Sequence, residues 1–302
     1  RSSMSTLRKF MANFNTNCTV LFDEPLSGHT TFRIGGPAEA YVIPRDASAL
    51  ATLVTAARDR DIRVTVLGGG ANVLVSDSGV KGIVVSTAGL DAVHVSPDGI
   101  MMAGAGVPVV RLADTAREFG LSGLEFAAGL PGSVGGAVFM NARCYDREFA
   151  DVLADVDALA PGPADTTRDG DPPLIRPTVL HPVTVQPEPG RWAYKMTPFM
   201  PGGRLEGAII TLARFRLVPG DREAISAAMS AHEDDRRAKG HFDYPSAGSL
   251  FKNNRAFGRP TGRILDELGF RGKRLGDAMV SPKHANIFVN AGNARAADVL
   301  EL

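Results

Sequence analysis

Residues 67–75 read Leu-Gly-Gly-Gly-Ala-Asn-Val-Leu-Val, with three consecutive glycines between two short apolar runs. The runs predict two strands, and the glycines predict a tight turn between them. Because glycine has no β-carbon, the N–H groups of such a turn can approach a phosphate and form an anion-binding nest. A plain turn is the alternative, and no helix follows that would make this a Rossmann unit. The candidate ligand-binding residues are Gly68, Gly69, Gly70, Ala71 and Asn72.

A second glycine-rich stretch, residues 129–142, reads Gly-Leu-Pro-Gly-Ser-Val-Gly-Gly-Ala-Val-Phe-Met-Asn-Ala. Taken alone, its glycines suit close packing of backbone on backbone as well as they suit a ligand. Two such loops together favour a ligand, because a long molecule with a diphosphate needs backbone donors from separate loops. The stretch adds the candidates Gly132, Ser133, Gly135, Gly136, Asn141 and Ala142.

The rest of the sequence predicts a mixture of helices and strands. Apolar residues at helical spacing predict helices over residues 46–60, 108–119, 221–239 and 261–268, and a further one from residue 296. Short β-rich runs predict strands over residues 64–67, 72–75, 82–85, 92–95, 208–217 and 286–289. Because helices and strands are grouped by region without strict alternation, we expect an α+β fold.

The chain is long enough to need more than one domain. At 302 residues it exceeds what one hydrophobic core usually supports. Eight of its 20 prolines lie in residues 161–190, where they predict a surface loop or bent edge strands. We expect a boundary near residue 218, which gives an N-terminal extension (1–25), a larger domain (26–217) and a smaller α+β domain (218–302).

The composition excludes several functional classes. The 33 basic residues balance the 33 acidic ones, which gives no indication of nucleic-acid or membrane-surface binding. Cys18 and Cys144 are too few for a disulfide scaffold, and neither they nor the six histidines have the spacing of a metal site. No apolar run has the length of a membrane span or the form of a signal peptide, so we expect a cytoplasmic protein without metal.

A third motif carries groups that suit catalysis. Residues 245–253 read Pro-Ser-Ala-Gly-Ser-Leu-Phe-Lys-Asn, which puts a serine on a glycine loop before a cation and an amide. Ser249 is not in a Gly-x-Ser-x-Gly elbow, so hydrolase chemistry has no specific support and proton donation suits it better. A simple Ser/Gly turn before a strand is the alternative. Tyr194 and Lys195 offer a phenol and an ammonium close together, and Arg236 and Lys239 lie at a helix end, where cations complement the dipole.

Six segments in order resemble the successive motifs of the UDP-N-acetylenolpyruvoylglucosamine reductase family. They are residues 30–36, 67–75, 123–126, 130–141, 247–253 and 283–286. The first half of the pattern is shared with the wider group of FAD-linked oxidases, and residues 247–253 distinguish the reductases. The short connection between the strand over 208–217 and the next helix resembles the second type of the family.

The resemblance implies a fold and a reaction. The larger domain would bind FAD in the manner of FAD-linked oxidases (PCMH/VAO-like), and the smaller one would bind a UDP-sugar. NADPH would reduce FAD, the flavin would pass hydride to the enolpyruvyl β-carbon, and a serine would protonate the α-carbon to give UDP-N-acetylmuramate for peptidoglycan. Ser249 and Lys195 would be catalytic, and the substrate-binding residues would be Tyr194, Arg236, Lys239, Lys252, Asn253, His284 and Asn286.

The sequence departs from the family pattern at three places. Lys195 replaces an arginine, and residues 143–146 read Arg-Cys-Tyr-Asp where the family has Gly-Ala-Tyr-Gly. The family also has a catalytic glutamate in a Glu-Pro-Glu segment that is not found before Leu302, so we expect FAD binding with slow substrate reduction. The alternatives are another FAD-linked oxidase and a catalytically silent module that binds FAD or a UDP-sugar.

Overall fold

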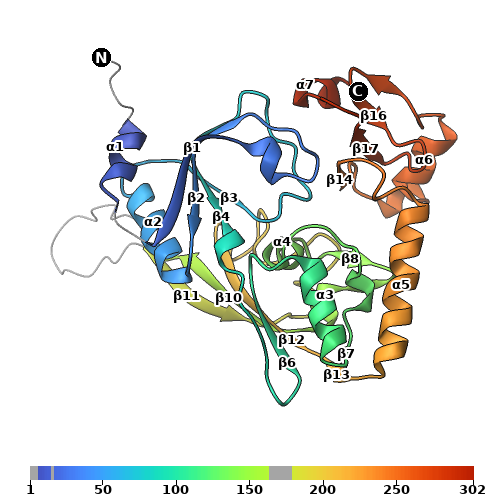
Figure 1. The fold of residues 1–302 in the computed structure, drawn as a ribbon, viewed down its shortest axis with the longest axis horizontal. Helices are drawn as coiled ribbons and strands as arrows, with labels where there is room; N and C mark the ends of the chain where they lie inside the picture. The colour runs from blue at the N-terminus through green and yellow to red at the C-terminus, as the bar shows by residue number, and fades with distance from the viewer. Residues whose placement is uncertain (1–5, 15–16, 163–178) are drawn as a thin grey trace.

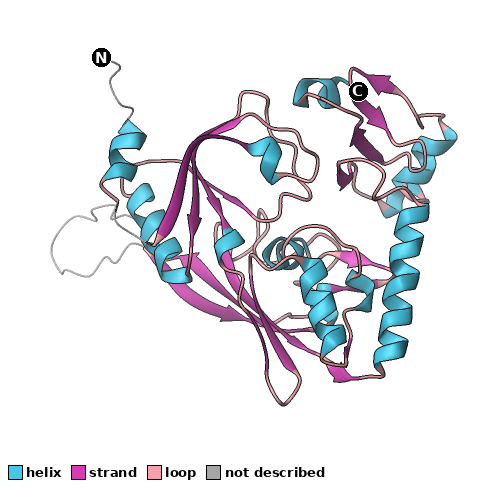
Figure 2. Ribbon diagram, in the orientation of Figure 1, coloured by secondary structure: helices cyan, strands magenta, loops and turns pink. Residues whose placement is uncertain are grey.

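The computed structural model describes residues 6–14, 17–162 and 179–302. Most of the predicted proline-rich loop, residues 163–178, lies outside the described residues. Two sheets with their helices form the N-terminal part, and a third sheet lies beyond the long helix α5 (Figure 1). Figure 2 shows both helices and strands, and two of the three larger sheets are antiparallel throughout, which confirms the expected α+β class.

The first sheet has the order β1-β2-β4-β3. Its strands are β1 (Cys18–Pro25), β2 (Pro37–Pro44), β4 (Val80–Ser86) and β3 (Val64–Leu67). β1 pairs antiparallel with β2, whereas β2 and β3 both run parallel to β4. The helix α2 (Ala47–Arg58) connects β2 to β3, and the Asp46 side chain caps it by accepting from the N–H of Ala49. This sheet therefore contains one strand–helix–strand unit, β2-α2-β3, which the sequence analysis did not predict. The short helix α1 (Thr6–Ala12) precedes β1.

The second sheet is antiparallel, with the order β11-β10-β12-β6-β5. Its strands are β11 (Leu180–Val185), β10 (Leu153–Pro161), β12 (Ile209–Arg216), β6 (Ile100–Gly104) and β5 (Val93–Val95). β11 contains Pro182 and lies at the edge of the sheet, where a missing N–H costs no ladder hydrogen bond. The helices α3 (Val109–Glu118) and α4 (Val134–Met140) belong to this part. So do two short two-stranded sheets. One pairs β7 (Leu121–Ser122) with β13 (Val218–Pro219), and the other pairs β8 (Arg143–Cys144) with β9 (Arg147–Glu148).

The C-terminal part is built on a four-stranded antiparallel sheet with the order β14-β17-β16-β15. Its elements are β14 (Ser246–Ser249), α6 (Thr261–Glu267), β15 (Arg274–Leu275), β16 (Ala278–Val280), β17 (Ile287–Asn290) and α7 (Ala296–Glu301). The helix α5 (Arg222–Ala238) leads to it from the N-terminal part and packs Ile225 and Met229 against Ala113 of α3. The expected boundary near residue 218 falls just before this helix.

An apolar cluster joins the C-terminal part to the N-terminal part. Phe32 and Ile34, which precede β2, are buried among Ala247, Val280 and Phe288 of the C-terminal sheet. Burial of an aromatic side chain contributes a few kcal/mol, roughly 2–3 for a phenylalanine. The C-terminal part is therefore held against a short segment of the N-terminal part.

The predicted helices are confirmed, and so are the predicted strands except one. Residues 72–75 do not form a strand. Their alternating apolar side chains are nevertheless packed, because Val73 and Val75 contact the cluster around Leu67, whereas Leu74 contacts the C-terminal cluster. The segment thus runs between two apolar clusters. Its apolar run indicated that the side chains are packed, but not that the backbone pairs with no described strand. Among the described residues, no helix has both the length and the apolar character needed to cross a membrane.

Candidate functional site

The two glycine-rich loops contact each other directly. The Gly69 N–H donates to Ser133 Oγ over 2.9 Å. A β-carbon on Gly69 would lie 2.6 Å from Gly132 Cα, and one on Gly68 would lie 2.6 Å from Ser133 Oγ. Glycine is therefore required here for backbone packing, which was one of the two interpretations of the sequence. The packing also brings both loops to one place, as a shared ligand requires.

The first loop also leaves backbone donors free for a ligand. In the part of the chain that the structure describes, the N–H groups of Gly70, Ala71 and Asn72 donate to no protein acceptor. Gly70 has a left-handed φ of +62°, and a β-carbon there would lie 2.2 Å from the His29 carbonyl oxygen. Consecutive unpaired N–H groups in a turn form a concave site for an anion. These residues fit the diphosphate of FAD.

Replacing Gly69 by alanine should therefore abolish most FAD binding. The new β-carbon would clash with the backbone of Gly132 and separate the loops. Flavin absorbance per chain after gel filtration measures the effect. Gly28→Ala is the matched control, because a β-carbon at Gly28 meets no atom within 4 Å. Full flavin content in Gly69→Ala would show that the contact of the loops is not needed for the cofactor.

Within the second loop, the Asn141 side chain is buried, with 1% of its surface exposed, and both ends of its amide are used inside the protein. Its Nδ2 donates to the Ala193 carbonyl over 3.1 Å, and its Oδ1 accepts from the Ala150 N–H over 2.9 Å. The side chain therefore holds the segment just before Tyr194 and offers no exposed amide to a cofactor. We propose this indirect role for Asn141 in place of a direct contact with FAD.

The remaining glycines of this loop lie around α4. Gly135 is buried, and a β-carbon on it would lie 2.8 Å from that of Ala105, so its lack of a side chain serves packing. Gly136 is exposed, with Ser133 Oγ 3.5 Å from its ideal β-carbon. Ala142 is half-buried after α4, and its N–H donates to the Ala137 carbonyl. The exposed Gly136 is the one of these three that is open to a ligand.

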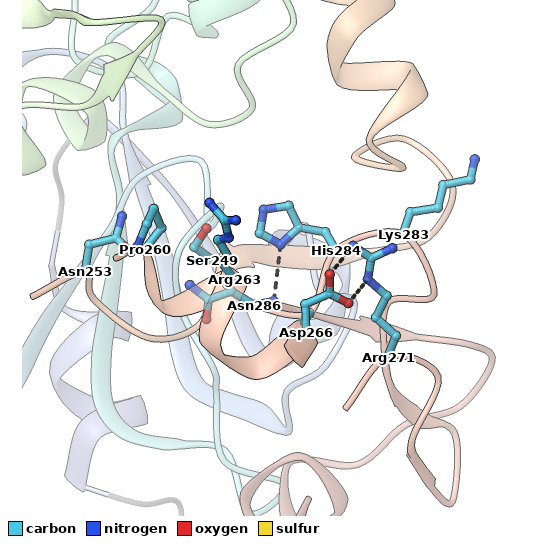
Figure 3. A pocket seen from close by; sticks show the side chains of 11 residues that line it. Ser249, Asn253, Pro260, Arg263, Asp266, Arg271, Lys283, His284 and Asn286 are labelled. Atoms are coloured by element: carbon cyan, nitrogen blue, oxygen red, sulfur yellow. Dashed lines mark hydrogen bonds and ion pairs between the residues drawn. The ribbon is translucent and has the colours of Figure 1, made fainter. Parts of the chain in front are cut away.

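A cavity of about 300 Å³ in the C-terminal part brings several predicted substrate residues together. Ser249, Asn253, His284 and Asn286 line it, and Figure 3 shows them around one space. They meet because β14, which ends at Ser249, pairs with β17, which follows His284 and Asn286. The motifs at residues 245–253 and 283–286 thus contribute to a single site.

Each of these side chains has a defined environment. Ser249 is exposed at the end of β14, and across the described ranges its hydroxyl has no hydrogen-bond partner. The Asn286 amide is used internally, because it accepts from the Phe251 N–H and donates to the Phe251 carbonyl, both over 2.9 Å. Asn253 Oδ1 accepts from the N–H of Thr261, the first residue of α6. Asn286 and Asn253 therefore shape the loop after Ser249.

His284 is set to donate a hydrogen bond into the cavity. Its Nδ1 accepts from the Asn286 N–H over 3.2 Å, which assigns the ring proton to Nε2 (Figure 3). Burial first, and then the charge of Arg271, lower its pKa below the ordinary value for histidine, so the ring is neutral near pH 7. Lys239 lowers the pKa of His284 further, which places that lysine near the cavity.

The cavity also contains cations that the sequence analysis missed. Arg263, Arg271 and Lys283 line it, and they pair with Glu267, Asp266 and Asp243 respectively. Lys283 is the first residue of the motif at residues 283–286, so the sequence could have indicated it as a site residue. Arg263 and Arg271 lie in and after an ordinary charged helix, where no spacing distinguishes them from surface residues.

The charge of Lys252 acts on Lys195, although the two residues come from different parts of the chain. Burial first, and then the charge of Lys252, lower the pKa of Lys195 below the usual lysine value. Lys195 is half-buried, and its φ of +50° is uncommon for a residue with a side chain. Its ammonium lies 5.7 Å from the ring centroid of Tyr194, which is exposed. Two neighbouring ammonium groups favour an anion between them.

Arg236 and Lys239 occupy different environments at the end of α5. Arg236 is buried against Gly129 and the ring of Phe242, and its Nη1 lies 3.9 Å from Cys144 Sγ. Its Nε has no partner among the described residues. Lys239 is exposed and pairs with Asp235 over 2.7 Å. Lys239 is thus accessible to a substrate, whereas Arg236 backs the second glycine-rich loop. The described residues contain no cluster of potential metal ligands.

Comparison with known proteins identifies relatives of both parts of the chain. Residues 38–162 match a family model described as an FAD binding domain, and residues 240–302 match that of the UDP-N-acetylenolpyruvoylglucosamine reductase C-terminal domain. UDP-N-acetylenolpyruvoylglucosamine reductase of Treponema denticola is 38% identical over 94% of this chain and 86% of its own length. The Agathobacter rectalis enzyme of that name is 41% identical over 94% of this chain and 86% of its own length. The crystal structure of the reductase from Thermus caldophilus covers 94% of this chain and 92% of its own, with a TM-score of 0.73 and 33% identity.

Proposed function

The chain belongs to the UDP-N-acetylenolpyruvoylglucosamine reductase family, and we propose that it uses NADPH and FAD to reduce UDP-N-acetylglucosamine enolpyruvate to UDP-N-acetylmuramate. One observation carries the proposal. Hydrogen bonds connect the two glycine-rich loops to each other and the first of them to the strand of Ser249, namely Gly69 to Ser133 and Asn72 to Ala247. A flavin and a proton donor therefore share one site.

The glycine-rich loops bind the cofactor. The free N–H groups of residues 70–72 hold the FAD diphosphate, and Gly136 lies beside them on the second loop. A bound FAD would supply the hydride chemistry between NADPH and the enolpyruvyl β-carbon. The protein aligns the substrate with the flavin and stabilises the negative charge that develops on the enolpyruvyl group.

Ser249 protonates the α-carbon of the enolpyruvyl group. Its hydroxyl is exposed at the cavity and donates to no other described group, so its proton is available to the substrate. Lys195 and Lys252 stabilise the negative charge that develops on the pyruvyl group after hydride arrives. Preorganised charges of this kind often supply the largest single contribution to stabilising the transition state.

The UDP part of the substrate binds along the C-terminal part. Lys239 neutralises the diphosphate, and Arg236 supports this end of the site from its buried position. Tyr194 borders the site beside Lys195. The neutral His284, together with Asn253 and Asn286, lines the cavity that receives the sugar nucleotide. We propose that the protein acts in the cytoplasm on this soluble substrate.

An anaerobic stopped-flow experiment tests the proposal. Flavin absorbance should fall when NADPH is added and should return when UDP-N-acetylglucosamine enolpyruvate follows. UDP-N-acetylglucosamine, which lacks the enolpyruvyl group, should restore nothing. Reduction by NADPH without reoxidation by the enolpyruvyl substrate would indicate a flavoenzyme for another substrate, and FAD binding without reduction would indicate a binding module.

A further inference from the structure

We infer that Thr31 and Asn72 are positioning residues for Ser249, an inference that rests on the proposed function. Asn72 was expected to contact FAD. Its Nδ2 instead donates over 2.8 Å to the Ala247 carbonyl, on the strand that ends at Ser249. Thr31 Oγ1 donates over 2.7 Å to the Ser246 carbonyl of the same strand. Two side chains of the N-terminal part thus hold adjacent residues of β14.

β14 needs such support because it is an irregular edge strand. Among the described residues it pairs with β17 alone, and its register shifts between Ser246, opposite Val289, and Ser249, opposite Ile287. Three residue steps on β14 therefore match two on β17, which is a bulge. Gly248, within the bulge, has a left-handed φ of +73°. A bulge redirects a side chain and leaves backbone groups without partners on the neighbouring strand. Here Thr31 and Asn72 donate hydrogen bonds to the carbonyls of Ser246 and Ala247.

The same two residues are tied to the cofactor loop. The Thr31 N–H donates to the Gly70 carbonyl over 3.0 Å, and Asn72 belongs to the loop itself. Phe32, next to Thr31, is buried in one cluster with Ala247. The loop that holds the FAD diphosphate and the strand that carries Ser249 are thus coupled through three hydrogen bonds and an apolar contact.

This coupling matters because hydride and proton reach neighbouring carbons of the substrate from groups on different parts of the chain. A displacement of about 1 Å in a catalytic group costs on the order of 100-fold in rate. The Thr31 and Asn72 hydrogen bonds fix where Ser249 lies relative to the flavin. They act on protonation through Ser249, without touching the substrate.

The test compares Thr31→Val and Asn72→Leu, each of which removes a donor at nearly constant volume. Both should retain FAD and reduction by NADPH, whereas reoxidation by the enolpyruvyl substrate should slow by roughly 10- to 100-fold. The loss should fall on kcat with little change in KM, and the solvent deuterium isotope effect on reoxidation should grow. Thr31→Ser keeps the hydroxyl and should restore the rate.

Asp77→Ala is the matched control. Asp77 also joins the two parts, because its carboxylate accepts from the Ala296 and Ala297 N–H groups at the start of α7 over 2.8 and 3.0 Å. It does not contact β14, so its loss should lower the melting temperature without slowing reoxidation. Equal slowing in all three variants would mean that general loosening is responsible and would overturn the inference. Asn72→Leu keeps the backbone N–H that faces the FAD diphosphate, so loss of FAD from this variant would show that the amide side chain itself serves the cofactor and would overturn its positioning role.

Hydrogen exchange separates this inference from the proposed function. Backbone amides of residues 246–250 should exchange faster in Thr31→Val and Asn72→Leu than in the wild type or Asp77→Ala. This readout does not depend on turnover. If the wild-type flavin is not reoxidised by the substrate, the proposed function is wrong, and unchanged exchange in these amides would show that the positioning inference is wrong.

Discussion

Replacing Ser249 by alanine should slow reoxidation of the reduced flavin by the enolpyruvyl substrate roughly 100- to 10,000-fold, the range that a positioned general acid typically contributes. Reduction by NADPH should change little, because no proton reaches the substrate in that step. Ser249 lies exposed at the cavity with its hydroxyl uncommitted, so its removal leaves no buried partner unsatisfied. Stopped-flow absorbance measures the two half-reactions separately.

Ser48→Ala is the matched control for this variant. Ser48 is exposed on α2, the helix that connects β2 to β3. Loss of its hydroxyl should leave both half-reactions unchanged. Equal slowing of both half-reactions in Ser249→Ala would indicate a structural role for the serine. Normal reoxidation would mean that another group or a water molecule donates the proton.

The sequence indicated most of the elements because their ends carry strong local signals. Asp46 before α2 and Gly240 after α5 are the residues expected at a helix start and just past a helix end. The edge position of β11 agrees with one of the two alternatives predicted for residues 161–190, a surface loop or bent edge strands, because proline cannot donate to a ladder. The strand predicted over residues 72–75 was wrong because a short apolar run indicates burial, whereas strand pairing depends on segments far away in the sequence.

The candidate site was predictable as a set of motifs but not as an arrangement. Ser249 and His284 carry recognisable motifs, yet only the pairing of β14 with β17 shows that they line one cavity. The roles of Asn72 and Asn141 were harder to predict, because an amide in a glycine-rich loop suits a ligand and a backbone carbonyl equally well. The partners of Asn72 and Thr31 lie 175 and 215 residues away, a separation about which local patterns carry no information.

The environment of Lys195 bears on its proposed role, which the resemblance assigns to an arginine. Lysine provides a compact charge on a flexible stem, whereas arginine provides a planar fork for two hydrogen bonds. Lys195 is half-buried, and its backbone is held at φ +50°. A fixed backbone and partial burial limit where the ammonium can lie, and the charge of Lys252 adds to its own. We therefore expect Lys195 to act by charge more than by geometry.

Lys195→Gln should accordingly reduce the rate of substrate reduction by roughly 100- to 1,000-fold, as loss of one preorganised donor to a developing oxyanion does. Lys195→Arg should lose much less, because it keeps the cation. Lys81→Gln, at an exposed lysine of β4, controls for loss of a positive charge and should be neutral. Single-turnover reoxidation measures all three variants. Activity of Lys195→Gln equal to that of the wild type would show that the lysine is an ordinary surface residue.

The pH dependence of the same step gives an independent check on Lys195. Its pKa lies below the usual lysine value, through burial and then Lys252. In the proposed role the protonated form is the active one, because only the ammonium stabilises negative charge. Substrate reduction should therefore be constant at lower pH and fall as pH rises through this lowered pKa. In Lys195→Arg the fall should move to higher pH, because a guanidinium stays charged throughout the accessible range. An alkaline limb that does not move between the two proteins would assign it to another group, and Lys195 would then have no part in stabilising the charge that follows hydride transfer.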